Sequence, residues 1–211
     1  MEVKDKILNK ADNLFRKFGI RGVTIDDICS ECGISKKTIY QHYSDKRSIA
    51  KKAINFYYDT VYADVQKITK SSLNAIESFF AISKYFRSTM NDVTPLLFHD
   101  LKKFHPKLYK TTNDYKENLF VKTIKKGISR GKEEGYIRIN INEDVIAKFR
   151  IESIEIGLNQ DVFPISKYDF RKVQIELFDL FIRGMVNNKG LKLYESIIKK
   201  INKWKNYSLY F

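Results

Sequence analysis

The sequence has few residues that interrupt helices and few that support covalent or metal chemistry. Its 211 residues include only three prolines, nine glycines, two cysteines and three histidines. Two cysteines cannot form a disulfide framework, which favours a reducing environment. No apolar run reaches the roughly 18 residues that a membrane-spanning helix needs, and the charged N-terminus lacks the apolar segment of a signal peptide. We therefore expect a cytoplasmic protein without a membrane partner.

Acidic residues are also scarce relative to basic ones. The chain has 39 Lys and Arg against 25 Asp and Glu, a net charge of +14 and a pI near 9.6. This excess favours anionic partners, nucleic acid above all. A lysine-rich and isoleucine-rich composition can equally reflect a biased genome, so the charge alone does not decide between the two explanations.

Apolar residues recur mostly at intervals of three to four residues, which predicts an all-α fold of about nine or ten helices. An N-terminal helix is predicted over residues 3–18. Beyond residue 70 the pattern changes to longer and more apolar helices, predicted over 72–91, 95–103, 106–133, 143–158, 168–187 and 190–205. Residues 136–141 alternate like a strand, but without a second strand to pair with they are interpreted as an extended connector.

The first fifty residues carry the clearest local signals. Gly19 is placed to end the first helix, and Thr24 to cap a second one, with an acidic residue at the capping-box position. Gly33 sits where a turn needs a positive φ. Ser35 then caps a short third helix, and Ser44 is expected to cap a long fourth helix that runs towards residue 68.

Two short helices joined by a glycine-containing turn form a helix-turn-helix. Isoleucines hold the pair together and leave the rest of the third helix free to face outward. Its N-terminal residues would meet base edges in the major groove, while hydroxyl, imidazole and ammonium groups nearby could bond phosphates. The residues predicted to contact DNA are Thr24, Ser35, Lys36, Lys37, Thr38, Tyr40, His42 and Lys46. The alternative reading of the lysines is ordinary solvated surface charge.

The stretches GIRGVTIDDI (19–28) and CGISKKTIYQHYSDK (32–46) resemble the DNA-binding signature of the tetracycline-repressor (TetR) family. The resemblance implies a helix-turn-helix domain over residues 1–46 and an effector-binding and dimerisation domain over residues 47–211. It further implies a homodimeric regulator that represses transcription from a palindromic operator in double-stranded DNA and is released by a small molecule. The same phosphate and base contacts follow by position. Val23 and Lys37 depart from the family pattern, and Lys37 places an additional cation at the groove.

Two groups of residues suggest metal or redox chemistry. Cys29 and Cys32 form C-x-x-C, but they align with buried family alanines and lack further ligands nearby. His99 and His105 flank Asp100, yet their spacing places them on different helix faces, which favours a surface role. We expect no metal site and no cofactor.

The 168–187 helix has an apolar face wider than packing within one protomer would need. Together with the 143–158 helix it is predicted to form the dimer interface. The residues assigned to this interface are Phe149, Ile156, Phe170, Val173, Leu177, Phe178, Phe181 and Met185. Ordinary core is the alternative for each of them.

Aromatic residues are dense beyond residue 70 and are candidates for lining an apolar effector pocket. The candidates are Tyr85, Phe86, Phe98, Phe120 and Phe149. A DNA-bound scaffold of the same fold that has a protein partner and no small-molecule effector is the main alternative, favoured by a filled interior. An enzyme is not expected, because the sequence has no nucleophile elbow, phosphate loop, paired catalytic carboxylates or metal-ligand set. The amphipathic 190–205 helix is predicted to dock on the large domain, with a membrane-surface helix as the alternative.

Overall fold

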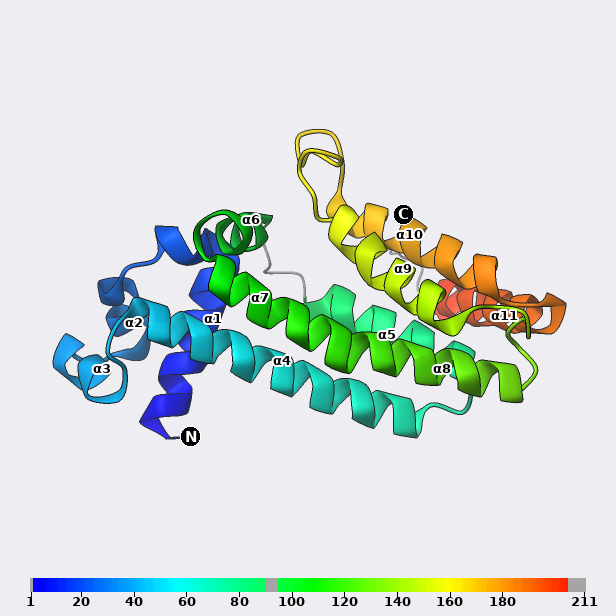
Figure 1. Cartoon of the computed structure of the whole chain (residues 1–211), viewed down its shortest axis with the longest axis horizontal. Coiled ribbons are helices and arrows are strands. Elements are labelled where there is room, and N and C mark those ends of the chain that lie inside the picture. Colours follow the sequence, from blue (N-terminus) through cyan, green and yellow to red (C-terminus); the bar gives the residue numbers. More distant parts are fainter. Residues whose placement is uncertain (1, 90–94, 205–211) are drawn as a thin grey trace. The chain divides into compact units, whose positions relative to one another are not determined.

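A computed structural model describes residues 2–89 and 95–204, apart from the side chains of residues 95, 98, 116, 118 and 201–204. Its elements, labelled in Figure 1, are α1 (Val3–Gly22), α2 (Ile25–Cys32), α3 (Lys36–His42), α4 (Lys46–Ser71), α5 (Ala75–Thr89), α6 (Pro95–Phe104), α7 (Pro106–Tyr115), the π-helical turn η2 (Lys116–Val121), α8 (Lys122–Glu133), α9 (Glu143–Ile156), α10 (Phe170–Met185) and α11 (Asn188–Trp204). Within these residues the regular structure is helical apart from one isolated antiparallel bridge. The predicted all-α fold is confirmed.

The helices predicted beyond residue 70 all have counterparts, and most bounds agree within a few residues. The predicted 106–133 helix is three consecutive elements, α7, η2 and α8, because the helix widens to a π turn over Lys116–Val121. None of the helices in the described ranges combines the length and apolar character needed to cross a lipid bilayer.

The chain forms two compact units. Unit 1 comprises residues 1–64 and 89–115, and unit 2 comprises residues 65–88 and 116–211. The chain passes from one unit to the other inside α4. The domain boundary predicted after residue 46 separates the helix-turn-helix from the rest of the chain and stays a prediction. The two packing units divide at a later point of α4, between residues 64 and 65.

The local signals around the helix-turn-helix are confirmed in detail. Gly19 breaks the helical path of α1 with φ 72° and ψ 165°. Thr24 caps α2 in a complete capping box with Asp27. Gly33 ends α2 in the left-handed conformation, φ 63° and ψ 38°, and the Ser35 side chain accepts the Thr38 N–H as the cap of α3. Each signal acts over three or four residues, so the local sequence is sufficient to determine it.

The cap of α4 differs from the prediction by one residue. Asp45, not Ser44, precedes the helix, and its Oδ1 accepts the Ser48 N–H at 2.6 Å. The Asp45 N–H in turn donates to Ser48 Oγ at 3.4 Å. Ser48 therefore stands at the capping-box position of Asp45, and this reciprocal pair favours Asp45 over Ser44.

The core of unit 1 joins the helix-turn-helix to the start of α4 and to α6 and α7. Its most buried members are Ile7, Ala11, Phe15, Ile20, Val23, Ile28, Cys32, Ile39, Tyr43, Ile49, Ala50, Ala53, Leu101 and Leu108. Asp100 on α6 is also buried and accepts the Arg21 N–H at 2.9 Å. The first helices of the chain are thus supported by residues about eighty positions away.

The core of unit 2 is formed by α5, α8, α10, α11 and the segment before α9. It contains Ile76, Phe79, Phe80, Ile128, Ile137, Phe178, Phe181, Ile182, Met185, Val186 and Tyr194. Leu193, Ile197 and Ile198 of α11 pack against this cluster, as predicted for a docked terminal helix. The sequence pattern places Ile201 and Trp204 on the same apolar side of this helix as Leu193, Ile197 and Ile198, and their side chains lie outside the described set.

The segment interpreted as an unpaired connector does have a partner. Ile137 forms the isolated antiparallel bridge with Val186, directly after α10. The Arg138 N–H donates to the Met185 carbonyl and the Asn187 N–H donates to the Tyr136 carbonyl, each at 3.0 Å. The strand-like alternation of residues 136–141 therefore reflects backbone pairing. The partner segment around Val186 is too short to be recognised as a strand from its sequence.

Candidate functional site

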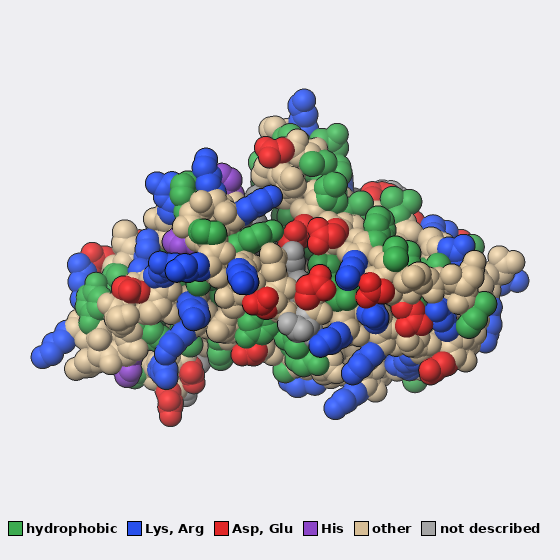
Figure 2. Space-filling view, in the orientation of Figure 1, with side chains coloured by type: hydrophobic (Ala, Val, Ile, Leu, Met, Phe, Trp, Pro, Cys, Tyr) green, Lys and Arg blue, Asp and Glu red, His purple; other side chains and the backbone are tan. Residues whose placement is uncertain are grey.

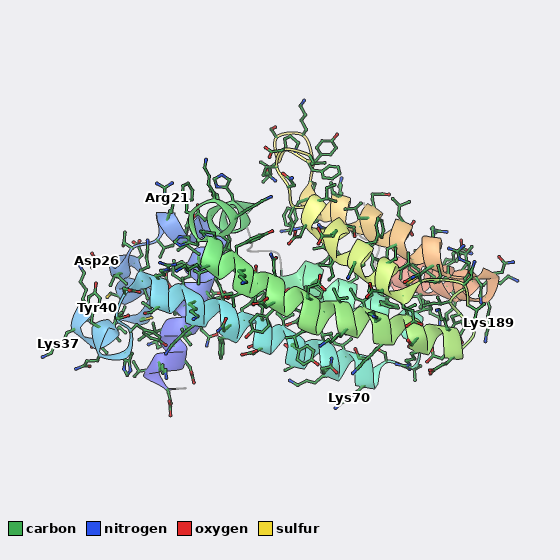
Figure 3. All side chains as sticks on the ribbon, in the orientation of Figure 1. Arg21, Asp26, Lys37, Tyr40, Lys70 and Lys189 are labelled. Atoms are coloured by element: carbon green, nitrogen blue, oxygen red, sulfur yellow. The ribbon has the colours of Figure 1, made fainter. Side chains whose placement is uncertain are left out.

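The exposed side of α3 is the candidate site of unit 1. Ile39 is fully buried and anchors the helix, whereas Lys36, Lys37, Tyr40 and His42 are exposed. Figure 3 shows Lys37 and Tyr40 projecting outward from the end of unit 1 that carries α3, and Figure 2 shows basic side chains gathered on this face of the unit. The predicted orientation of α3, apolar side inward and cationic side outward, is what a recognition helix requires.

The hydroxyls predicted to contact DNA already have partners. Thr24 Oγ1 accepts the Asp27 N–H at 3.1 Å and donates to Asp27 Oδ2 at 2.7 Å. The Thr24 N–H and hydroxyl together lower the pKa of the exposed Asp27 carboxyl. Ser35 Oγ accepts the Thr38 N–H at 3.1 Å and lies 3.0 Å from Thr38 Oγ1. These side chains fix the starts of α2 and α3 by accepting backbone N–H groups of the first turn.

Two of the predicted lysines are also held within the unit. Lys36 Nζ pairs with Asp26 Oδ2 at 2.9 Å, and the hydrogen bond that this ammonium donates to Asp26 raises the pKa of Lys36. Both side chains are more than half exposed, so the pair is weak and open to exchange. Lys46 Nζ donates to the Val23 carbonyl at 2.7 Å and ties the start of α4 to the loop before α2. Three donors on an ammonium leave capacity for a phosphate as well.

Tyr43 belongs to the core of unit 1. Its side chain is 3% exposed and its hydroxyl donates to the Lys4 carbonyl at 3.3 Å. Arg47, one residue after Lys46, is exposed at the start of α4 and was not singled out from the sequence. Its position beside a capped helix start was the available signal.

The cysteine pair lacks the features of a reactive thiol. Burial is the first cause that raises the pKa of both Cys29 and Cys32, whereas reactive thiols have lowered values. His99 is largely exposed, 3.9 Å from Asp100 Oδ1, while burial lowers the pKa of His105. In the part of the chain that the structure describes, no cluster of three His, Cys, Asp or Glu residues could hold a metal ion.

Four residues assigned to the dimer interface belong to the protomer's own core. Val173, Phe178, Phe181 and Met185 are between 0% and 9% exposed, and the last three are members of the unit 2 cluster. Because these side chains are buried within the protomer, they have almost no exposed surface to offer a second copy. Part of the wide apolar face of α10 therefore belongs to the protomer's own core, which is the alternative given for these residues in the sequence analysis.

The other interface candidates lie nearer the surface. Phe149 and Ile156 on α9 are 54% and 46% exposed, and Phe170 and Leu177 on α10 are partly buried. Exposed apolar residues that the assignment omitted are Val145, Val162, Ile165, Tyr168 and Leu180. An apolar surface on α9 and α10 therefore remains, narrower and shifted relative to the predicted one.

Three of the five pocket candidates form a row of contacting rings in unit 2. Tyr85 contacts Phe86, and Phe86 contacts Phe120, with ring centroids 5.8 and 6.0 Å apart. Phe149 is exposed on α9. Phe98 belongs to α6 of unit 1, and its side chain lies outside the described set. Edge-to-face aromatic pairs of this kind fill space, so the three contacting rings resemble core packing.

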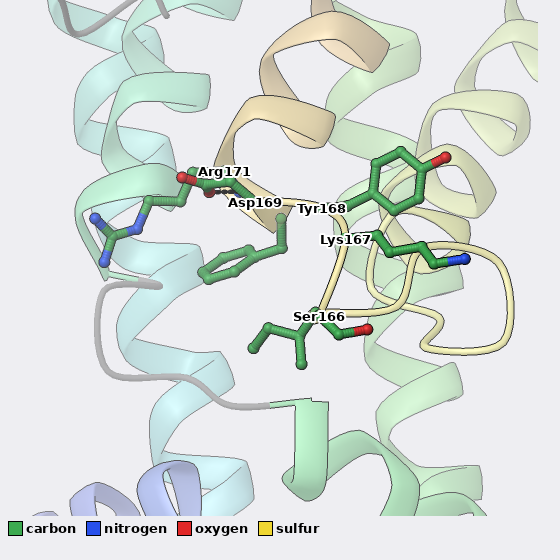
Figure 4. Close-up of a pocket in the computed structure, with 7 residues that line it drawn as sticks. Ser166, Lys167, Tyr168, Asp169 and Arg171 are labelled. Atoms are coloured by element: carbon green, nitrogen blue, oxygen red, sulfur yellow. Dashed lines mark hydrogen bonds between the residues drawn. The ribbon is translucent and has the colours of Figure 1, made fainter.

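A concave site is present in the loop between α9 and α10. Its lining residues are consecutive, from Ile165 to Arg171, and it has a volume of about 450 Å³ open to solvent (Figure 4). Asp169 caps α10 here by accepting the Arg171 N–H at 2.8 Å. Because one short segment forms the whole wall, the concavity lacks the enclosure that small-molecule sites have.

A capped helix-turn-helix with an exposed, cationic second helix has the arrangement of DNA-binding domains of the helix-turn-helix class. The sequence model for "Bacterial regulatory proteins, tetR family" matches residues 7–53, which cover α2, α3 and most of α1. The N-terminal part of the chain is therefore similar to the TetR family.

Curated relatives match a part of the chain. The biofilm operon icaADBC HTH-type negative transcriptional regulator IcaR of Staphylococcus epidermidis is 38% identical over 61 residues, which cover 27% of this chain and 33% of IcaR. The alignment thus spans only a third of that relative's length.

Solved structures extend the likeness of fold to most of the chain. A TetR-family regulator from Agrobacterium tumefaciens has a TM-score of 0.73 at 14% identity and covers 88% of this chain and 98% of its own. A transcriptional regulator from Saccharomonospora viridis in complex with choline has a TM-score of 0.69 at 22% identity with the same coverage. These relatives are regulators and not enzymes, in agreement with the sequence-based expectation.

Proposed function

We propose that the protein is a homodimeric, cytoplasmic repressor that binds a palindromic operator in double-stranded DNA and leaves it when a small molecule binds unit 2. The observation that carries this proposal is the presentation of α3. A buried isoleucine, a satisfied N-terminal cap and a left-handed glycine hold a short helix rigidly with its cations outward. Support from the relatives is consistent, since IcaR is a negative regulator.

Each residue has a proposed role that follows from its position. Lys37 and Thr38, in the first turn of α3, would lie nearest the base edges. Tyr40 and His42 would contact phosphates through the hydroxyl and imidazole. Lys36 would exchange Asp26 for a phosphate, since the existing ion pair is exposed. Thr24, Ser35 and Lys46 would act through the helix starts that they fix, with Lys46 also close enough to the loop to reach a phosphate.

Dimerisation is proposed through the exposed apolar residues of α9 and α10. Val145, Phe149 and Ile156 recur along one side of α9, and Leu180 is 64% exposed on α10. Gly184, one turn after Leu180, has no neighbouring atom within 4 Å of a built Cβ. A helix-interior glycine costs about 1 kcal/mol relative to alanine, and an open glycine lets another helix approach closely. A dimer that binds a palindrome must hold its two recognition helices about 34–36 Å apart to enter successive major grooves.

The experiment measures binding of the full-length protein to the DNA upstream of its own gene by fluorescence anisotropy. The palindromic segment is compared with a scrambled duplex of equal length and composition. We expect tighter binding to the palindrome, and an at least tenfold loss or a relaxed preference for Lys37→Ala. Lys70→Ala is the matched control, because Lys70 is an exposed lysine at the end of α4, in unit 2. Equal affinity for both duplexes would contradict the proposal.

The scaffold alternative also has an observation in its favour. Tyr85, Phe86 and Phe120 pack against one another, as expected for a filled interior with a protein partner. The small-molecule proposal is favoured by a different feature of unit 2, the buried side chain of Arg150, which has no carboxylate partner in the described part of the chain. A ligand-induced loss of DNA affinity separates the two, because a scaffold without an effector would show none.

A further inference from the structure

Arg150 on α9 is a buried cation in unit 2. It is 9% exposed, and its guanidinium carbon lies 5.3 Å from the Phe178 ring centroid and 5.5 Å from that of Phe181. Its Nη1 donates to the Ser153 hydroxyl at 3.3 Å. Among the described residues this hydroxyl is the only hydrogen-bond acceptor of Arg150, and no carboxylate forms an ion pair with it. A fork with five N–H donors is therefore only partly used.

The local electrostatics make this arrangement costly. Burial, and to a lesser extent the charge of Arg87 on α5, lower the pKa of Arg150 to about 10. The side chain still carries its proton at neutral pH, so the positive charge stays in the interior. Ring faces offset part of the lost hydration, and a single neutral hydroxyl offsets little more.

The surroundings combine apolar and polar groups. Phe80, Phe178 and Phe181 contribute a run of rings from α5 and α10, in which Phe80 and Phe178 are 6.5 Å apart. Buried polar side chains lie on the same three helices: Ser78, Ser83, Ser153 and Gln174. Arg87 donates to the Ser83 hydroxyl at 2.7 Å. A cation among aromatic rings and hydroxyls has the composition of a site for an amphiphilic anion.

We propose that the effector of this protein is a small organic anion with an apolar body, whose carboxylate or phosphate forms a bidentate pair with Arg150 while its apolar part contacts the phenylalanines beside it. This inference rests on the proposed function and specifies the ligand of unit 2. A planar guanidinium matches the two oxygens of either group, and binding of the anion neutralises the unbalanced charge. The choice of arginine at a core position of α9 then has a chemical reason.

The test is a thermal-shift titration of the full-length protein. The probes are benzoate, cinnamate, octanoate and phenyl phosphate, each compared with a neutral counterpart: benzamide, cinnamamide, octanamide and phenol. We expect at least one anion to raise Tm in a concentration-dependent way and its neutral counterpart to have no such effect. The phenyl phosphate arm distinguishes a phosphate ligand from a carboxylate. If none of the anions exceeds its neutral counterpart, the proposal is overturned.

Variants locate the effect. Arg150→Met should abolish the anion's shift, with Tm in the absence of anion equal to or above that of the unaltered protein, because an unbalanced buried charge is removed. Arg171→Met is the control, an exposed arginine of the same unit, and should respond normally. Should Arg150→Met fail to fold, Arg150→Lys keeps the charge but lacks the fork and should bind the anion at least tenfold more weakly. An unchanged response in Arg150→Met, or in Arg150→Lys where that variant replaces it, overturns the proposal.

The thermal-shift result does not depend on DNA, so the two proposals fail separately. An anion that binds through Arg150 but leaves operator affinity unchanged would refute ligand-controlled repression and retain the anion site. Operator binding without any thermal shift by an anion would refute the anion site and retain the DNA-binding proposal.

Discussion

Replacing Gly19 by alanine tests how the first helix is joined to the rest of unit 1. Gly19 has φ 72° and ψ 165°, a region that residues with a Cβ rarely adopt. A Cβ built at this position lies 2.6 Å from Asp100 Oδ2, which is closer than any ordinary contact. The same carboxylate oxygen accepts the Arg21 N–H at 2.9 Å, so it cannot move away without losing that hydrogen bond.

The expected destabilisation combines three terms. Backbone strain in this region costs about 1–3 kcal/mol. Loss of a hydrogen bond to a buried charged group costs about 1.5–3 kcal/mol. Alanine restricts the unfolded chain more than glycine does and returns about 0.4–1 kcal/mol. We therefore expect the free energy of unfolding to fall by about 2–5 kcal/mol, a large part of a typical domain's stability.

Urea denaturation followed by circular dichroism measures this change, with two glycines as matched controls. Gly33→Ala has the left-handed conformation but no atom within 4 Å of its Cβ, so only strain of about 1–2 kcal/mol applies. Gly22→Ala is helical with its nearest neighbour at an ordinary 3.7 Å, so it should be neutral or stabilising. The reasoning is refuted if Gly19→Ala costs no more than Gly33→Ala.

Two further predictions concern charge and assembly. Burial raises the pKa of Asp12 to about 6 despite its 2.8 Å ion pair with Arg16, so protonation of Asp12 favours the folded state. This contribution to stability is complete below the unfolded pKa of 3.8 and is lost as pH rises through 6, by up to about 3 kcal/mol. The difference in unfolding free energy between the unaltered protein and Asp12→Asn should fall by this amount over the same pH range. A difference that does not change with pH would contradict the prediction. Phe149→Glu, on the exposed side of α9, should shift the protein from dimer to monomer in light scattering without loss of helical content, whereas an unchanged mass would remove α9 from the interface.

Local signals in the sequence were sufficient for much of the fold and for the orientation of α3. The caps by Thr24 and Ser35 and the turn at Gly33 each involve hydrogen bonds within a few residues, so the residue types identify them. The shift of the α4 cap from Ser44 to Asp45 marks the limit of this approach, since both residues can cap and only the reciprocal bond to Ser48 decides.

Features that depend on distant partners could not be predicted. The apolar face of α10 looks the same whether Phe178 meets its own core or a second copy, because both environments are apolar. Likewise, nothing near Lys46 in the sequence indicates that it binds the Val23 carbonyl. Arg150 did leave a trace, since it stands three residues after the buried Ala147 at an inward-facing position of α9, where an arginine is unusual.

The bridge between Ile137 and Val186 closes the chain on itself at the base of the α9–α10 pair. Everything from α9 to the end of α10 leaves and returns at this one point, where the Arg138 and Asn187 amides are paired. The energetic cost of lengthening a loop grows only slowly with its length. Insertions or deletions in the exposed turn around Val162 and Ile165 should therefore leave the Ile137–Val186 bridge intact. The loop between α9 and α10 can then differ in length and shape between relatives while the rest of unit 2 keeps its packing.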